Sequence, residues 1–170
     1  ATNFIQRHYK NFTSMSWVYS CGAGANYGTA LESALKMGET IHIPSCCYEI
    51  EEYIHGPNLQ LTPQYNVIFF DGNDVASHRV EQVYKATRKV SNRAYLISNN
   101  PQLVMDDHVL SLSDTVSSEL CPLVYLPFVQ LLSFIISNDL HSIYQHPLLK
   151  EFKAIAAAKT ENFVNYDGDD

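Results

Sequence analysis

The sequence predicts an α/β fold, a three-layer α-β-α sandwich around a five-stranded, mostly parallel sheet. Short apolar runs alternate along the chain with longer stretches of helical periodicity, which is the order of a doubly wound sheet. The apolar runs do not alternate with polar residues, as expected for parallel strands covered on both faces. With 170 residues, the chain is long enough for one substantial core. We therefore expect a single domain over residues 1–163, followed by an acidic tail over 164–170.

The expected elements follow one another in order. A first helix precedes the first strand, and further helical segments lie between the strands or follow the last one. The five expected strands cover residues 17–20 ("WVYS"), 41–44 ("IHIP"), 67–70 ("VIFF"), 94–98 ("AYLIS") and 109–112 ("VLSL"). The expected helices cover residues 2–12, 29–38, 77–89, 117–137 and 147–159.

Composition excludes several classes of partner. The net charge is -7, with 18 acidic against 11 basic residues, and no basic run occurs. This balance argues against nucleic acid and anionic membranes as partners. The apolar stretch 120–136 contains two prolines and is short for a membrane span, so we expect a buried helix. The four cysteines show no C-x-x-C spacing, which favours free, mostly buried thiols and a cytoplasmic location.

A glycine-rich turn lies where ligands bind in open α/β sheets, beyond the carboxyl ends of the strands. Gly22, Gly24 and Gly28 follow the first expected strand and open a helix. A dinucleotide cradle is one interpretation, because helix-start N–H groups bind phosphate. The spacing is G-x-G-x-x-x-G, and the second expected strand ends in Pro-Ser-Cys rather than in a ribose-binding acid, so this interpretation is weak. A tight turn without ligand is the alternative. Residues 45–47 are the second turn expected at this edge.

The helix that follows carries a stripe of charge. Apolar residues at helical spacing predict its buried face, and these are Tyr27, Ala30, Leu31, Ala34 and Leu35. Glu32, Lys36 and Glu39 lie beside that face at i, i+4 and i+7. The plain interpretation is a solvated ion pair worth a few tenths of a kcal/mol. Glu39, however, follows Gly38 at the helix end, where the macrodipole disfavours a carboxylate and Lys36 favours one. Such a carboxylate suits proton transfer on carbon.

His55 stands in an "HGP" segment. A single histidine is more often structural than catalytic. No H-E-x-x-H or paired Cys/His spacing occurs. Glu39 and His42 have a spacing that could in principle hold a metal, but His42 is expected in a strand, so we expect neither a metal nor a cofactor.

Together these residues resemble a known family. The stretch 22–57 looks like the second sugar-isomerase (SIS) domain of phosphosugar enzymes, and is similar to the isomerase half of glucosamine-6-phosphate synthase. The family pattern is roughly G-x-G-x-x-Y-x-x-A-x-E-x-A-L-K-x-x-E followed by E-x-x-H-G-P. The later "FFDGND" resembles the "LGND" turn of the fructosamine-6-phosphate deglycase branch. Matching residues are Gly22, Gly24, Tyr27, Ala30, Glu32, Ala34, Leu35, Lys36, Glu39, Glu52, His55, Gly56 and Pro57.

The resemblance implies a flavodoxin-like SIS fold and a set of roles. Glu39 would move a proton between C1 and C2 of an open-chain sugar phosphate. His55 would act on ring opening or as an acid, in the synthase within the neighbouring subunit's site. Lys36 and Glu32 would support these groups. Gly22, Gly24 and Asn26 are the other residues expected at the substrate.

The resemblance also has departures. Family members usually have two SIS domains, and the Ser/Thr-rich phosphate loop belongs to the first; here Ser45 is a weak substitute. The chain therefore looks like the second half of a longer protein, or a subunit that pairs with a first SIS domain in a homodimer or larger assembly. The lysine-bearing tail of the synthase is not matched. We therefore expect a deglycase that cleaves a fructosamine-type or glucoselysine-type 6-phosphate. The alternatives are an aldose–ketose isomerase or aminotransferase, and a non-catalytic sugar-phosphate sensor.

Overall fold

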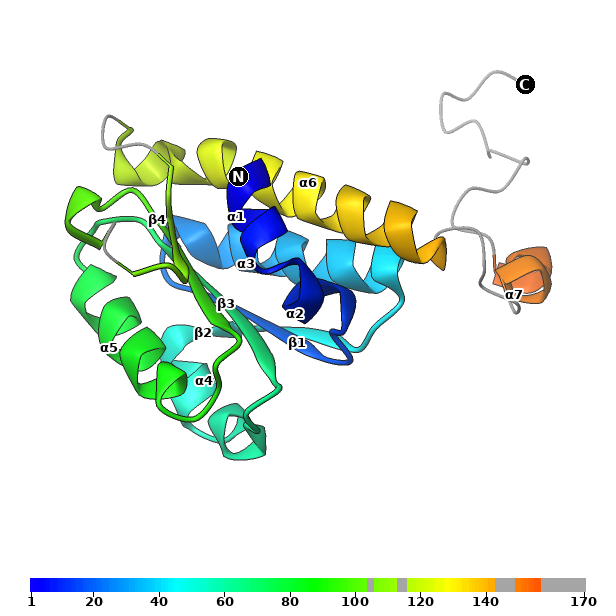
Figure 1. Cartoon of the computed structure of the whole chain (residues 1–170), viewed down its shortest axis with the longest axis horizontal. Helices are drawn as coiled ribbons and strands as arrows, with labels where there is room; N and C mark the ends of the chain where they lie inside the picture. The colour runs from blue at the N-terminus through cyan, green and yellow to red at the C-terminus, as the bar shows by residue number, and fades with distance from the viewer. Residues whose placement is uncertain (104–105, 113–115, 143–148, 157–170) are drawn as a thin grey trace, which may run out of the picture.

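The protein is described by a computed structural model that covers residues 1–103, 106–112, 116–142 and 149–156. Its centre is a five-stranded parallel sheet in the order β2-β1-β3-β4-β5 (Figure 1). Each hydrogen-bonded neighbour runs in the same direction, which confirms the predicted fold class. The strands are β1 (Val18–Gly22), β2 (Ser45–Glu49), β3 (Asn66–Asp71), β4 (Ala94–Ser98) and β5 (Val109–Ser111).

Helices cover both faces of the sheet. Side chains of α1, α2, α3 and α6 share one core cluster, and side chains of α4 and α5 share another. The α-helices are α1 (Thr2–Arg7), α2 (Tyr9–Thr13), α3 (Ala25–Lys36), α4 (Ile50–Ile54), α5 (Ser77–Arg88), α6 (Cys121–Leu140) and α7 (Leu149–Ala156). A π-helix, η1 (Met37–Ile41), continues α3, and the 3₁₀ turns are η2 (Pro57–Gln60), η3 (Pro101–Leu103) and η4 (Ser118–Leu120). Residues 157–170, which include the expected tail over 164–170, lie outside the described residues.

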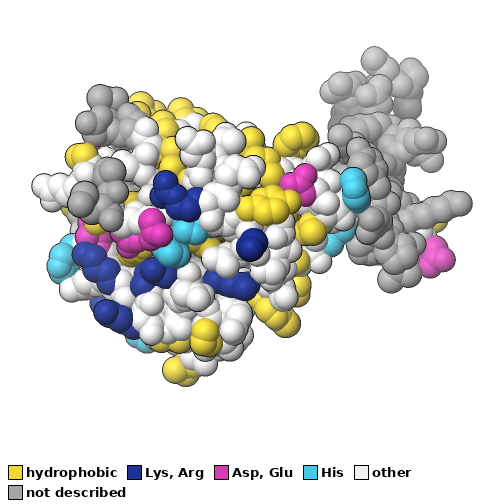
Figure 2. Space-filling view, in the orientation of Figure 1, with side chains coloured by type: hydrophobic (Ala, Val, Ile, Leu, Met, Phe, Trp, Pro, Cys, Tyr) yellow, Lys and Arg dark blue, Asp and Glu magenta, His cyan; other side chains and the backbone are white. Residues whose placement is uncertain are grey.

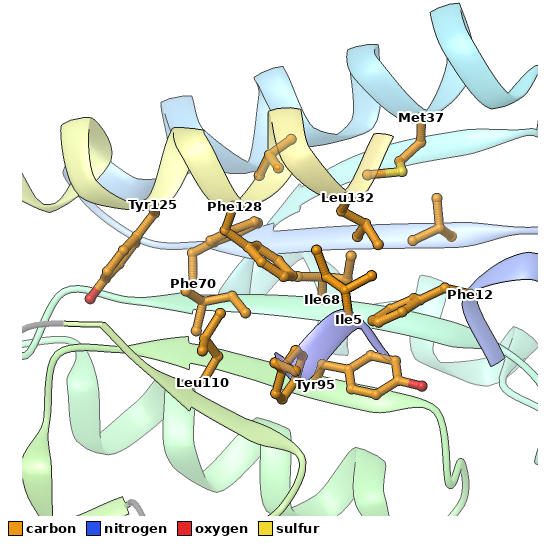
Figure 3. Packing of buried hydrophobic residues seen from close by; sticks show 14 of the residues in the cluster. Ile5, Phe12, Met37, Ile68, Phe70, Tyr95, Leu110, Tyr125, Phe128 and Leu132 are labelled. Carbon is orange, nitrogen blue, oxygen red and sulfur yellow. The ribbon is translucent and has the colours of Figure 1, made fainter. Parts of the chain in front are cut away.

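The two cores lie on opposite faces of the strands, because successive strand residues point to opposite sides. On the α3–α6 side, Phe70 and Ile68 of β3 meet Phe128 and Leu132 of α6 (Figure 3). On the α4–α5 side, the alternate residue Phe69 packs on the rings of helical tyrosines. Every residue of β3 is buried, as the lack of polar alternation predicted.

The second strand differs from the prediction. Residues 41–44 were expected to form it, but Ile41 ends the π-helix and His42 takes a left-handed φ of 63°. The observed strand β2 starts at Ser45, and it lies at the edge of the sheet. An edge strand is only partly buried, so its sequence need not be apolar throughout, and "SCCYE" carried no strand signal. Residues 45–47 are therefore strand rather than a ligand-facing turn.

The buried face of α3 also differs from the prediction. Leu31 and Leu35 are 49% and 52% exposed. The helix instead buries Asn26, Thr29, Ala30, Ser33 and Ala34. Small and polar side chains can face the sheet here because they are paired, as where Ser20 Oγ donates to Ser33 Oγ at 2.9 Å. The helix is thus rotated from its expected orientation, and two leucines are left on its outer face.

Helix α6 is, by length and composition only, apolar enough to cross a membrane, and the described residues contain one such helix. In this fold it is part of the sandwich. Phe128, Leu132 and Ile136 are buried against the sheet and α3. Its other face is exposed and apolar, including Leu123 and Phe134 at 69% and 66% exposure.

The four cysteines are free, as expected, although they differ in exposure. Cys21 and Cys121 are buried, Cys47 is partly buried and Cys46 is exposed. Desolvation raises the pKa of the Cys47 thiol to about 11. That thiol is therefore a poor nucleophile at neutral pH.

Candidate functional site

The charged stripe of the sequence forms a linked cluster on the outer face of α3 and η1. We call Glu32, Lys36 and Glu39 the α3 charge stripe. The Lys36 ammonium lies 2.7 Å from Glu39 Oε2 and 3.4 Å from Glu32 Oε1. The side chains of Lys36 and Glu39 are 28% and 50% exposed. The stripe is thus reachable from outside the chain, and Glu39 is held by a short, charge-assisted hydrogen bond.

The π-helix determines where Glu39 points. The helix was expected to end near Gly38, but the chain continues as η1 through Ile41. Thr40 Oγ1 donates to the Lys36 carbonyl at 2.7 Å, and Ser142 at the end of α6 donates to the Thr40 carbonyl at 2.6 Å. A Cβ on Gly38 would lie 3.2 Å from Ser45 Oγ, so a larger residue there would press on the start of β2. π-Helical turns are rare and often mark functional positions.

The charges of the stripe sum to -1, with two carboxylates against one ammonium. The hydrogen bond to Glu39 is the main cause that raises the pKa of Lys36 above its ordinary value. Lys36 is therefore fully charged, and its ammonium group is already paired with Glu39. A dianionic phosphate would meet a net negative surface here, so the stripe by itself does not provide a phosphate site.

His55 follows α4 and is exposed. Its Nδ1 lies 2.6 Å from the Glu51 carbonyl, which can only accept a hydrogen bond. In the neutral ring, Nδ1–H is therefore the donor and Nε2 is the acceptor. This arrangement fixes the ring at the helix end and presents Nε2 as a proton acceptor.

Glu39 and His55 lie in different layers. η1 contributes Met37 and Ile41 to the core that α3 and α6 share, whereas α4 contributes Ile50 and Tyr53 to the core on the other face. The sheet separates these two layers (Figure 1). One copy of the chain therefore holds the two side chains on opposite sides of the sheet.

The glycine turn lies at the far end of α3 from Glu39. Since α3 starts after the carboxyl end of β1 and leads back to the amino end of β2, its two ends lie at opposite edges of the sheet. A rise of about 1.5 Å per residue separates Gly24 from Glu39 by roughly 20 Å. The structure thus brings Glu32, Lys36 and Glu39 together, and it places Gly22, Gly24 and Asn26 elsewhere.

Gly22 and Gly24 are each required by the local backbone. A Cβ on Gly22 would collide with the backbone carbonyl of Asn26, and Gly24 has a φ of +54°. Asn26 is fully buried, and its Oδ1 accepts a hydrogen bond from Thr29 at 3.2 Å. Among the described residues, its Nδ2 has no hydrogen-bond partner. These residues shape the start of α3, and none of them faces open solvent except Gly24.

Ser45 is not a phosphate ligand in this fold. Its hydroxyl donates to the Ala34 carbonyl at 2.6 Å, and it lies at the amino end of β2. It therefore fastens β2 to α3 at the amino edge of the sheet. The expected ligand-binding turn required the carboxyl edge.

Sequence reasoning missed the polar residue at the end of β3. Asp71 is fully buried, and its carboxylate accepts hydrogen bonds from Ser77 Oγ (2.5 Å), Ser98 Oγ (2.7 Å) and the Asn73 backbone (3.1 Å). The aspartate in "FFDGND" was the available signal. With its partners supplied by the chain, Asp71 ties β3 to β4 and to the start of α5.

One group of metal-type ligands occurs in the described part of the chain, formed by Asp106, Asp107 and His108. His108 Nδ1 lies 2.8 Å from Asp107 Oδ1, and its Nε2 lies 3.0 Å from the Asn92 carbonyl. Asp106 accepts from the Tyr84 hydroxyl at 2.7 Å. The ligand atoms of this group are thus already hydrogen-bonded within the chain. The group does not belong to α3 or η1, so it is separate from the α3 charge stripe.

Comparison with solved structures identifies the architecture. A candidate phosphosugar isomerase from Clostridium difficile superposes with a TM-score of 0.75 at 21% identity, over 93% of this chain and 44% of that one. The chain has the sugar-isomerase (SIS) fold. The C-terminal domain of glucosamine-fructose-6-phosphate aminotransferase from Francisella tularensis superposes with a TM-score of 0.68 at 23% identity, over 81% of this chain and 40% of that one. Tagatose-6-phosphate ketose/aldose isomerase from Escherichia coli superposes with a TM-score of 0.68 at 15% identity, over 82% of this chain and 40% of that one.

The SIS fold of this chain spans less than half the length of those three solved chains. No family model matches the sequence, and no curated protein matches it either. At these identities the likeness establishes the fold, and the activity has to be argued from the residues.

Proposed function

We propose that the α3 charge stripe is one half of a phosphosugar-processing site that is completed by a second SIS domain. The observation on which this depends is the Glu39–Lys36 contact of 2.7 Å on an accessible π-helix. A carboxylate held by an ammonium group is oriented to take a proton from carbon, and the ammonium can stabilise charge that develops on the neighbouring oxygen. The SIS folds of the aminotransferase and the ketose/aldose isomerase support the substrate class.

The partner must supply the phosphate-binding groups, because the stripe carries a net negative charge. The outer faces of α3 and α6 are a suitable surface for it. We call Leu31, Leu35, Leu123 and Phe134 the α3–α6 apolar face, and all four are about half to two-thirds exposed. Hydrophobic side chains also follow the upper edge of the molecule over α6 (Figure 2). Exposed apolar surface of this kind is typical of protein interfaces, and it adjoins the charge stripe on α3.

The reaction that we favour is deglycation of a ketoamine 6-phosphate. Glu39 would take a proton from C1 and return it to C2, which converts the ketoamine into an imine at C1. Water then adds to this imine, and the C–N bond breaks. An acid protonates the departing nitrogen, and our candidate is His55 of another copy, whose Nε2 would first take up the proton that it then delivers. The sum is ketoamine 6-phosphate plus water giving glucose 6-phosphate plus amine, with no change of oxidation state and no cofactor.

The second candidate is an aldose–ketose isomerase, which the named activity of the Escherichia coli neighbour favours. Both reactions need the same C1–C2 proton transfer, so Glu39 would serve either. They differ in whether an amine is released. Incubation with fructosyl-lysine 6-phosphate tests the first reaction, and interconversion of fructose 6-phosphate and glucose 6-phosphate without amine tests the second.

The decisive variant is Glu39→Gln in the complete protein. We expect turnover to fall by about 10²–10⁴-fold, since the amide cannot act as a base. The measurement is the rate of glucose 6-phosphate formation, with circular dichroism to confirm the fold. Glu81→Gln is the matched control, because Glu81 also pairs with a lysine, Lys85, and lies on α5 on the other side of the sheet. Unchanged turnover in Glu39→Gln would remove Glu39 from the mechanism.

A further inference from the structure

A cavity lies on the opposite side of the sheet from the α3 charge stripe. It has a volume of about 700 Å³ and opens between α5 and the segment formed by α4 and η2. Protein sites for small organic ligands have volumes of roughly 300–1,000 Å³. Because α3, α6 and the stripe belong to the other layer, this cavity is separate from the charge stripe. His55, the proposed acid, follows the cavity-lining residue Ile54 in the chain.

The wall of the cavity is largely apolar. The side chains of Tyr53, Ile54 and Leu61 form one side, and those of Val83, Ala86 and Val90 form the other. At its base, the hydroxyls of Tyr53 and Thr87 are hydrogen-bonded to each other at 3.0 Å, so both are satisfied without a ligand. An occupant would therefore gain affinity chiefly from an aliphatic or aromatic body.

One polar atom in the wall lacks a partner. Asn58 lines the cavity, and its Oδ1 is buried without a hydrogen-bond partner among the described residues. A buried amide oxygen without a partner is costly, and such atoms often indicate an unplaced ligand or water. The carbonyl oxygen accepts only, so the occupant must carry an O–H or N–H donor.

Two basic side chains, those of Arg79 and Lys85, line the cavity. They belong to the segment 79–89, which has four of the 11 basic residues of the chain against the single acid Glu81, and dark blue side chains gather over α5 in Figure 2. Arg79 is bound at two points by Glu51, at 2.6 and 3.1 Å. Lys85 is 63% exposed and has only an i,i+4 contact of 3.2 Å with Glu81, which an anion can displace at little cost.

We propose that the α4–α5 cavity binds a small organic carboxylate with an apolar body and a hydroxyl or amino donor. The carboxylate would pair with Lys85, the donor with Asn58 Oδ1, and the apolar body would fill the space between the two helices. The exposed ammonium group of Lys85, opposed only by its i,i+4 contact with Glu81, favours a carboxylate at this position although the net charge of the chain is -7.

The site can be tested with 3-phenyllactate as the probe and ¹⁵N-labelled protein followed by NMR. We expect saturable, 1:1 shifts confined to amides of residues 53–61 and 79–90, with a Kd of about 1–10 mM for a ligand of this size. The neutral analogue 3-phenyllactamide should bind at least fivefold more weakly. Shifts centred on α3 and α6, or no saturation by 30 mM, would overturn the proposal. So would cavity shifts that depend on protein concentration without probe, since a second copy would then be the occupant.

Three variants locate the contacts. Lys85→Gln should abolish the preference for phenyllactate over its amide, whereas Lys89→Gln, on the same basic segment but outside the cavity wall, should leave it unchanged. Ala86→Phe is a substitution at an exposed position that fills the mouth, and it should weaken both ligands at least tenfold; Val90→Phe serves if that variant is unstable. A preference that survives Lys85→Gln would disprove recognition of the carboxylate. No sugar chemistry is measured, so this outcome is independent of the proposed function.

Discussion

Gly22 illustrates how closely the first turn of α3 approaches the end of β1. A methyl group there would overlap the backbone of Asn26, whereas Gly28, one turn into the same helix, has nothing within 4 Å of a built Cβ. The two glycines belong to one sequence pattern, but only the first is required by packing.

This contrast gives a paired prediction. Gly22→Ala should lower the free energy of unfolding by at least about 1–3 kcal/mol, because the Asn26 backbone cannot move aside without disturbing the first turn of α3. Gly28→Ala should raise it by about 0.5–1 kcal/mol, since alanine is the better residue inside a helix. Urea denaturation measures both. Equal effects of the two substitutions would contradict the packing role of Gly22.

The α3 charge stripe could be predicted from the sequence, whereas the residues on the inner face of α3 could not. Glu32, Lys36 and Glu39 follow helical spacing, which depends only on local geometry. Burial of Ser33 depends on Ser20, a residue of another element that satisfies its hydroxyl. Local periodicity contains no information about such a partner, so the leucines were expected inside.

Among the elements, the parallel strands β1, β3 and β4 were predictable because they are wholly buried and therefore apolar. β2 was not, because an edge position tolerates polar residues. The π-helix η1 was not predictable either, since no propensity distinguishes it from the end of an α-helix. That single difference moves Glu39 from a helix terminus into a helical turn.

The α3–α6 apolar face leads to a prediction about assembly. The double variant Leu35→Gln/Phe134→Gln should dissociate the complex with a second copy or SIS domain, while the free energy of unfolding of the chain changes by less than about 1 kcal/mol, because both side chains are already exposed. Sedimentation velocity measures the assembly. Val75→Gln is the control, as Val75 is fully exposed in another part of the molecule. An assembly that survives the double variant would place the interface elsewhere.

The molecule as a whole should be sensitive to alkali. Desolvation raises the pKa of the buried tyrosines Tyr53, Tyr84 and Tyr125, and that of Tyr95 to about 12. Their ordinary value is 10.0. A raised folded-state pKa means that the stabilisation is fully present below pH 10 and is lost as pH rises, because the unfolded chain then releases protons that the folded chain retains.

The expected slope is steep. Four such groups would lower the free energy of unfolding by about 5 kcal/mol per pH unit once the unfolded tyrosines are ionised. Urea midpoints between pH 8 and 11.5 measure it, with tyrosinate absorbance as a second signal. Tyr53→Phe should reduce the slope by about a quarter, because one of the four tyrosine protons no longer contributes. Tyrosinate absorbance that reaches the full value for all 11 tyrosines before unfolding would show that these hydroxyls titrate in the folded state.

Opposite placement of Glu39 and His55 determines how subunits would have to cooperate. If both serve the proposed reaction, a working site takes Glu39 from one copy and His55 from another. Glu39→Gln and His55→Asn should each be inactive alone in the complete protein. Mixed and reassembled in equal amounts as a two-fold dimer, they should recover about a quarter of wild-type activity, because half of the dimers are mixed and each has one intact site. Absence of recovery, with mixed dimers confirmed by mass spectrometry, would mean that His55 acts outside this site.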